Sequence, residues 1–250
     1  MRRLIFLFVT LALSCSFLRA QTVDEIIARS VEARGGIRKL KAVQTLRMTG
    51  HISFGPNLDG TLLVEMKRPA KLREQVTLGG KTMLRTTNGK EGWVINQFED
   101  DPGPQPVSAS ELANMLQKAD FDRPLVDYKE KRTRIELAGR EKLDDKDTFK
   151  LKVTLKDGQI RYDYIGASSY LELKWEGRVK KGDEDFQAES FFHDYRSVEG
   201  VMYPFEIDSD SPGTESQQKI IFDKIEVNPP LDDASFEKPN LPTAADTATH

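Results

Sequence analysis

Hydrophobic and polar positions repeat with a helical period at the start of the chain and alternate after residue 43. Thr22 and Glu25 have the spacing of a capping box, which predicts a helix start, and Gly35-Gly36 suits a helix end. The apolar face between these signals consists of Ile26, Ile27, Val31 and Ala33. We therefore expect a first helix here, followed by one short helical turn.

Alternation from residue 45 onward predicts strands. In the first three strands, one face of each is apolar and consists of Leu46, Met48, Ile52, Leu62, Val64, Met66, Leu72, Val76 and Leu78. Gly79-Gly80 and Asn88-Gly89 are hairpin turn sequences. Consecutive strands joined by such turns indicate an antiparallel meander.

The clearest hairpin signal is Asp157-Gly158, which lies between two alternating segments. A two-residue turn at this position pairs Val153 with Tyr162 and Leu151 with Tyr164. The apolar residues of both strands then share one face of the sheet. Register and turn chemistry thus favour the same pairing.

About eleven strands are expected in all, because alternation recurs near 131–138, 169–177, 185–195, 201–208 and 217–227. One helix interrupts the strands over 108–118, where Ser108 and Glu111 form a second capping box. No strand-helix-strand rhythm occurs. The pattern indicates an α+β fold, mainly antiparallel β.

The N-terminal segment predicts export. Arg2 and Arg3 precede an apolar run over 4–13, and the stretch that ends at Ala20 completes the organisation of a cleaved secretory signal peptide. A lipid anchor on Cys15 is the alternative. We expect a periplasmic protein with three parts, namely a signal peptide (1–20), a single domain (21–228) and a largely unstructured tail (229–250).

Composition narrows the possible partners. Hydrophobic residues make up 38% and charged residues 31% of the chain, as suits a sheet with one solvated face. The formal net charge is −3, and it becomes −6 without the three arginines of residues 1–20, so nucleic acid is not an expected partner. Cys15 is the only cysteine, which excludes disulfides and thiolate chemistry from a chain cleaved near Ala20.

The sequence contains no recognisable catalytic set or metal site. His51 and His193 lack a second ligand at metal-binding spacing, and the Gly-x-Ser-x-Gly motif does not occur. Adjacent acids such as Asp144-Asp145 are typical of solvated turns. We expect no cofactor, no metal and no enzymatic activity. A hydrolase would require a cleft that joins His51 or His193 to a carboxylate and a serine.

The expected sheet has more apolar surface than its helices can cover. Only ~30 helical residues accompany about eleven strands, and a sheet of this size tends to curl. A curled sheet with an apolar concave face encloses either a packed core or a ligand cavity. The pattern favours a cavity, and a filled core is the alternative.

A set of segments carries a family resemblance. In chain order they are Glu32-Ala33-Arg34-Gly35-Gly36, Thr45-Leu46-Arg47-Met48-Thr49-Gly50, Asn88-Gly89-Lys90-Glu91-Gly92-Trp93, Asp194-Tyr195-Arg196-Ser197-Val198-Glu199-Gly200-Val201 with Tyr203-Pro204-Phe205, and Lys224-Ile225-Glu226-Val227-Asn228. Over about residues 23–240 the chain resembles a divergent branch of the LolA/LolB-like outer-membrane lipoprotein-sorting family. The resemblance implies an unclosed half β-barrel of about eleven strands with helices over its concave face.

The resemblance and the apolar pattern together predict a periplasmic carrier that holds acyl chains of lipids or lipoproteins in a hydrophobic cavity, with lipoprotein sorting to the outer membrane as the role implied by the family. The candidate cavity residues are Leu46, Met48, Leu62, Val64, Met66 and Trp93, and the candidate lid residues are Leu112, Met115 and Leu116. The alternative is a non-enzymatic sensor or scaffold module that binds an inner- or outer-membrane envelope protein through the same sheet.

Overall fold

The computed structural model describes residues 21–55, 57–181, 184–210 and 217–240, so the expected signal peptide and the last ten residues lie outside the described chain. Within these ranges, the strands form a single antiparallel sheet. The elements are α1 (Val23–Ala33), α2 (Ile37–Ala42), β1 (Thr45–Phe54), β2 (Asp59–Lys67), β3 (Lys71–Leu78), β4 (Lys81–Thr87), β5 (Gly92–Asn96), β6 (Gln105–Pro106), α3 (Ala109–Lys118), β7 (Arg134–Leu143), β8 (Lys146–Thr154), β9 (Ile160–Gly166), β10 (Glu172–Lys181), β11 (Glu184–Val198), β12 (Val201–Asp210), β13 (Gln217–Val227) and the 3-10 turn η1 (Asp233–Phe236).

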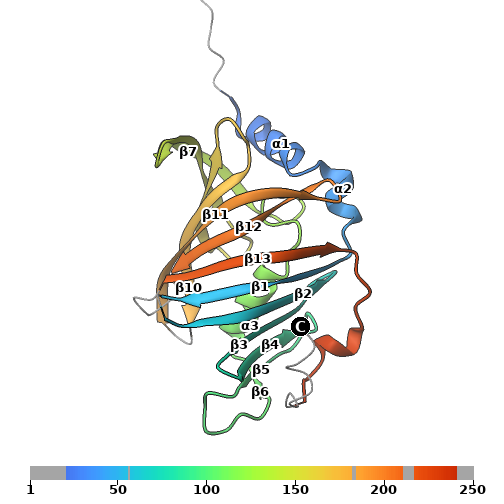
Figure 1. Ribbon diagram of the computed structural model, residues 1–250. Helices are drawn as coiled ribbons and strands as arrows, with labels where there is room; N and C mark the ends of the chain where they lie inside the picture. Colours follow the sequence, from blue (N-terminus) through green and yellow to red (C-terminus); the bar gives the residue numbers. More distant parts are fainter. Residues whose placement is uncertain (1–20, 56, 182–183, 211–216, 241–250) are drawn as a thin grey trace, which may run out of the picture.

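The two strands at the edges of the sheet are consecutive in the sequence. The order is β6-β5-β4-β3-β2-β1-β13-β12-β11-β10-β9-β8-β7, so β1 pairs with β13 and the edges are β6 and β7. Residues 107–133, which connect these edges and include α3, therefore cross the open side of the curved sheet (Figure 1). α3 contacts β3, β4 and β10. The expected unclosed half-barrel is confirmed, with thirteen strands in the described residues rather than about eleven.

Both predicted capping boxes are present. The Thr22 hydroxyl accepts from the Glu25 N–H at 3.2 Å, and the Thr22 N–H donates to the Glu25 carboxylate at 2.9 Å. Ser108 and Glu111 make the same two hydrogen bonds at the start of α3, both at 3.2 Å. Each box satisfies main-chain N–H groups that have no partner within the helix, which explains why both helices start where the sequence indicates.

The end of α1 packs against the turn between β11 and β12. Gly35 has φ +119°, and a Cβ at this position would lie 2.3 Å from the Gly200 carbonyl oxygen. The Met202 N–H donates to the Arg34 carbonyl at 3.0 Å. Only glycine fits this contact. The contact joins two of the segments that carry the family resemblance.

The register of β8 and β9 corrects the sequence prediction by one residue. Val153 pairs with Arg161, and Leu151 pairs with Asp163 rather than with Tyr164. Successive strand residues point to opposite faces, so the shift exchanges every inward and outward side chain of β9. Charged residues, rather than tyrosines, thus share the face of the buried valine and leucine.

The turn explains the shift. The Leu155 N–H donates to the Gln159 carbonyl at 2.9 Å, and the Gly158 N–H donates to the Leu155 carbonyl at the same distance. Gly158 has φ +88°, as in the longer hairpin loop that follows a type I turn with a left-handed residue. The Asp157-Gly158 signal located the hairpin correctly, but the loop is longer than two residues.

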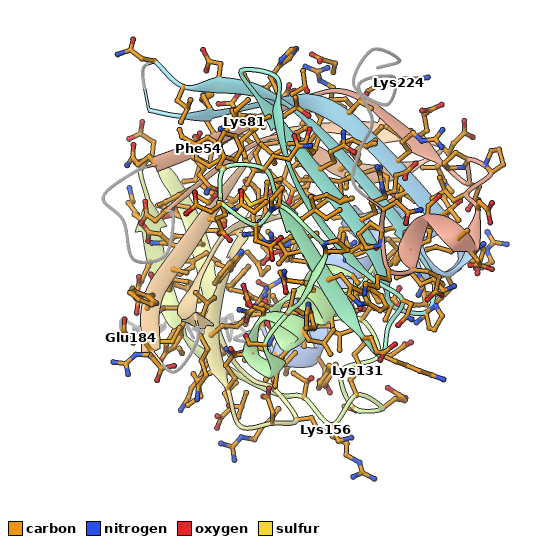
Figure 2. All side chains as sticks on the ribbon, turned by 90° about the horizontal axis from the view of Figure 1, so that it is seen from below. Phe54, Lys81, Lys131, Lys156, Glu184 and Lys224 are labelled. Carbon is orange, nitrogen blue, oxygen red and sulfur yellow. The ribbon has the colours of Figure 1, made fainter. Side chains whose placement is uncertain are left out.

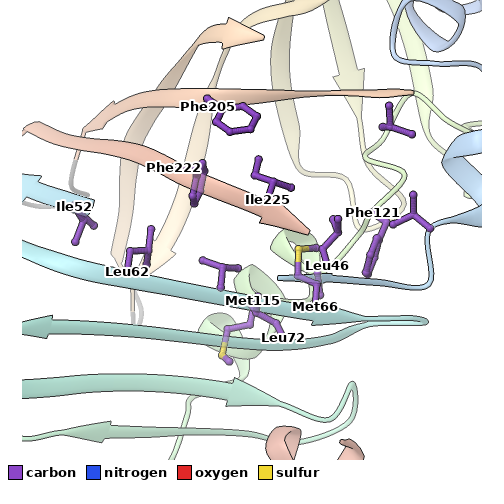
Figure 3. Close-up of a cluster of buried hydrophobic side chains, with 14 of the residues drawn as sticks. Leu46, Ile52, Leu62, Met66, Leu72, Met115, Phe121, Phe205, Phe222 and Ile225 are labelled. Carbon is purple, nitrogen blue, oxygen red and sulfur yellow. The ribbon is translucent and has the colours of Figure 1, made fainter. Parts of the chain in front are cut away.

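Side chains fill the hollow of the sheet (Figure 2). The larger group, shown in part in Figure 3 and called the concave cluster below, consists of Leu40, Val43, Leu46, Ile52, Leu62, Val64, Met66, Leu72, Val76, Leu78, Met115, Ala119, Phe121, Val126, Val201, Phe205, Phe222 and Ile225. A second group joins α1 to β8 and β9 and includes Ile26, Leu151 and Ile165. The hollow is therefore a packed core along most of its length.

Part of the C-terminal segment is attached to the sheet. Phe236 is fully buried, and Asp233 binds Lys71 at 2.7 Å and Lys67 at 3.1 Å. These contacts hold η1 beside β3.

Candidate functional site

The structure brings five of the six predicted cavity residues together on the concave face. Leu46 pairs with Met66 and Met48 pairs with Val64 across β1 and β2, and Leu62 continues the same face of β2. Four of them belong to the concave cluster, and Met48 packs against it. The alternating pattern thus identified the inward face correctly.

Trp93 does not join this group. The register carries the concave face from Leu72 through Thr87 to Gly92, so the side chain of Trp93 lies on the opposite face of β5. A Cβ at Gly92 would lie 2.7 Å from Val107 and close to α3. The sequence prediction placed Trp93 in the cavity wall, whereas the inward position of this strand is the neighbouring Gly92.

The three predicted lid residues lie on α3, and only one of them is fully buried. Met115 is 4% exposed and belongs to the concave cluster, whereas Leu112 and Leu116 are half-buried. Ala119, directly after the helix, is also buried. The apolar attachment of α3 therefore depends on a short stretch at its C-terminal end.

Exposed polar contacts complete the attachment of α3. The Asn114 side chain donates to the Lys180 carbonyl at 2.7 Å, and the Gln117 amide donates to the Gln159 side chain at 2.7 Å. Lys118 forms an ion pair of 3.0 Å with a carboxylate of β3. The first two contacts lie at the surface and contribute little individually, whereas the Glu74 side chain that Lys118 binds is only 18% exposed. Met115 and its neighbours supply the apolar part of the attachment.

Neither of two surface grooves is lined by the predicted cavity residues. One, of about 700 Å³, runs between α3 and strands β9 to β11, and polar side chains such as Asn114, Gln117 and Arg178 line it. The other, of about 320 Å³, separates α1 from residues 125–130. With α3 in place, other side chains pack against the predicted cavity residues, and these residues do not line an open cavity.

A charged cluster lies beside the apolar one and was missed by the sequence prediction. Asp163 is 1% exposed and binds Arg161 at 2.6 Å, and Glu172 accepts from Arg161 at 3.0 Å and from Arg123 at 2.7 Å. Burial raises the pKa of Asp163 to about 6, against the opposing effect of Arg161. The one-residue register error hid this cluster, because it placed tyrosines on the inner face.

A second buried carboxylate, Asp122, joins three parts of the chain. Both of its oxygens accept from the Arg68 guanidinium, at 2.8 and 3.0 Å, and one also accepts from Lys41 at 2.6 Å. Burial alone would raise the pKa of Asp122, but the hydrogen bonds from Arg68 and Lys41 outweigh it and lower the pKa to about 2.

The two strand histidines form only simple pairs. His51 lies 3.2 Å from Asp223, and His193 lies 3.3 Å from Asp208. Neither histidine lines either groove. No group of three or more potential metal ligands occurs in the part of the chain that the structure describes. Across those same residues, every helix is too short or too polar to traverse a bilayer.

Comparison with solved structures places this architecture among known folds, whereas no protein-family model and no curated protein matches the sequence. A DUF1329 family protein from Desulfovibrio piger ATCC 29098 superimposes with a TM-score of 0.59 at 16% identity, covering 87% of this chain and 98% of that one. A LolA superfamily protein from Nitrosomonas europaea gives 0.55 at 18% identity, with 88% and 99% covered.

A third match is a domain described as an outer membrane lipoprotein-sorting protein, from Vibrio parahaemolyticus. It has a TM-score of 0.52 at 13% identity and covers 85% of this chain and 97% of that one. These similarities extend over nearly the whole length of each protein, and they agree with the resemblance seen in the sequence. The chain therefore has the LolA-like fold, as a divergent form of it.

Proposed function

We propose that the protein is an exported, non-enzymatic binding protein of the cell envelope that holds acyl chains against its concave face. In this proposal α3 is a movable lid, which the structure shows in place over the concave face. The observation that carries the proposal is that a large inward apolar surface is covered in part by a short helix, α3, of which only Met115 is fully buried.

A comparison of the free energy gained by burying an acyl chain with that gained by burying Met115 of α3 supports replacement of the helix by lipid. An acyl chain that buries about ten methylenes gains about 8 kcal/mol. Burial of Met115 contributes about 1.5–3 kcal/mol, and each exposed contact of α3 contributes roughly 0–1 kcal/mol. The acyl chain thus gains more free energy by burial than Met115 does, which supports a displacement of α3 from the concave face.

The location and cargo rest on two further arguments. The N-terminal segment has the organisation of a secretory signal peptide, and periplasmic export would bring the protein to lipids and lipoproteins. One similar structure is described as an outer membrane lipoprotein-sorting domain. We include lipoprotein sorting in the proposal because lipoproteins present the same acyl chains as free lipids.

Native mass spectrometry of the exported protein, purified without detergent, tests the proposal. The expected result is a bound fatty-acid or phospholipid species, or one-to-one binding after incubation with such a lipid. Co-purification of one stoichiometric protein without lipid would instead support the sensor or scaffold alternative. A protein that neither carries nor takes up lipid would contradict the carrier proposal.

A further inference from the structure

Two arginines, Arg34 and Arg123, lie where the charged cluster borders the concave cluster, close enough for the charge of Arg123 to lower the pKa of Arg34. Arg34 is the C-terminal cap of α1, and its position is fixed by the contact of Gly35 with Gly200. Arg123 lies in the segment after α3, with its guanidinium 4.6 Å from the ring centroid of Phe192. Separate elements thus hold two guanidinium groups on one side of the interior.

The ion pairs leave one positive charge of this cluster uncompensated. Arg161 pairs with Asp163 and Glu172, and Arg123 pairs with Glu172. Among the described residues, no carboxylate lies within ion-pair distance of Arg34. Three guanidinium groups therefore face two carboxylates, and the excess charge is on Arg34.

Arg34 also has unused hydrogen-bonding capacity. Its guanidinium donates to the main-chain carbonyls of Phe121 at 3.3 Å and Asp122 at 3.2 Å. A guanidinium carries five N–H donors, and these two acceptors are neutral. Burial lowers the pKa of Arg34, and the charge of Arg123 lowers it further, whereas the charge of Glu172 opposes both effects without cancelling them.

Apolar groups continue directly from these arginines. Tyr203 packs against the concave cluster; burial raises its pKa to about 12, while Arg34 and Arg68 oppose this rise. Phe121, whose carbonyl accepts from Arg34, is itself a member of the concave cluster. The surface therefore changes from cationic to apolar over a few side chains.

We propose that Arg34 and Arg123 bind the anionic head group, a carboxylate or a phosphate, of an amphiphile whose acyl chains lie on the concave face. The proposal rests on the proposed lipid-binding function and adds the class of ligand. Arg34 is half-buried and the Arg123 side chain is 35% exposed, so a head group reaches both from solvent. Guanidinium groups suit such anions because their parallel N–H groups match two oxygens.

The test compares lipids that share acyl chains but differ in charge. Phosphatidylglycerol or a free fatty acid is the anionic probe, diacylglycerol is the neutral probe, and inorganic phosphate is the head group without chains. Binding is measured by native mass spectrometry titration on the wild-type protein, Arg34→Gln, Arg123→Gln and the control Arg38→Gln. Arg38 is exposed on α2, so its replacement removes a charge from the same region but not from the site.

We expect the wild type to prefer anionic over neutral lipid by roughly tenfold or more. The preference should disappear in Arg34→Gln and Arg123→Gln and remain in Arg38→Gln. If Arg34→Gln fails to fold, as judged by its thermal unfolding, Arg123→Gln decides alone.

Each other outcome overturns a distinct part of the account. Equal affinity for anionic and neutral lipid, or a preference that survives both substitutions, would contradict the head-group site while the carrier proposal stands. If the protein binds inorganic phosphate but binds none of the lipids, the arginines form a site for a free anion, and both proposals are contradicted.

Discussion

Asp122 links the segment after α3 to α2 and to the end of β2. Its carboxylate is 6% exposed and accepts from both Arg68 and Lys41. Arg68 in turn donates to the carbonyls of Leu40 and Val43. A single buried carboxylate therefore neutralises two cations and helps to attach the segment that crosses the opening.

Replacing Asp122 with Asn should make the free energy of unfolding less dependent on pH in the acidic range. The pKa of about 2 lies below the ordinary value of 3.8, so the ionised carboxylate stabilises the fold above about pH 4. This contribution, about 2 kcal/mol, is lost as the pH falls from about 4 toward 2. At pH 7 we expect Asp122→Asn to lower the free energy of unfolding by about 3 kcal/mol, and the difference from wild type to shrink over that acidic window.

Urea unfolding at pH 7 and at pH 2.5 provides the measurement. Asp127→Asn is the matched control, because Asp127 binds the same Lys41 but is 39% exposed, and its loss should cost roughly 0–1 kcal/mol. A difference between wild type and Asp122→Asn that is the same at both pH values would show that the carboxylate does not act through its charge.

α3 covers the concave face through close contact with a glycine of β5. A Cβ at Gly92 would meet Val107, Leu112 and Met115, and the backbone of Gly92 needs no positive φ. A larger side chain at this position should therefore push α3 away without straining its own strand.

We expect Gly92→Leu to increase the binding of an apolar fluorescent dye such as N-phenyl-1-naphthylamine several-fold, because the displaced helix uncovers the concave cluster. Gly103→Leu is the control, since a Cβ at Gly103 would meet only the Asp101 carboxylate, at 3.1 Å. Circular dichroism should show that both variants keep the sheet. Unchanged dye binding in a folded Gly92→Leu would indicate that the apolar face stays covered without α3.

Local signals in the sequence predicted the elements better than their pairing. The capping boxes at Thr22 and Ser108 located both helices, because the hydrogen bonds that start a helix lie within four residues. The β8–β9 register depends on whether the turn has two or more residues, and Asp157-Gly158 is compatible with both. The inward positions of Arg161 and Asp163 depend on that difference.

The topology explains why one helix occupies the opening. Pairing of β1 with β13 makes β6 and β7 the two edges of the sheet, so the connection between them crosses the hollow (Figure 1). The resemblance to the LolA/LolB-like family predicted an unclosed half-barrel, and the structure confirms it. The packed state of the hollow was not predictable, because a strand pattern shows which residues point inward but not what covers them.

Hydrogen exchange with and without bound lipid tests the central claim, that an acyl chain replaces α3 on the concave face. We expect the amides of α3 to lose protection when fatty acid or phospholipid is bound, while those of β1 and β2 keep or increase theirs. Lipid bound at one-to-one stoichiometry with α3 equally protected in both states would contradict the claim.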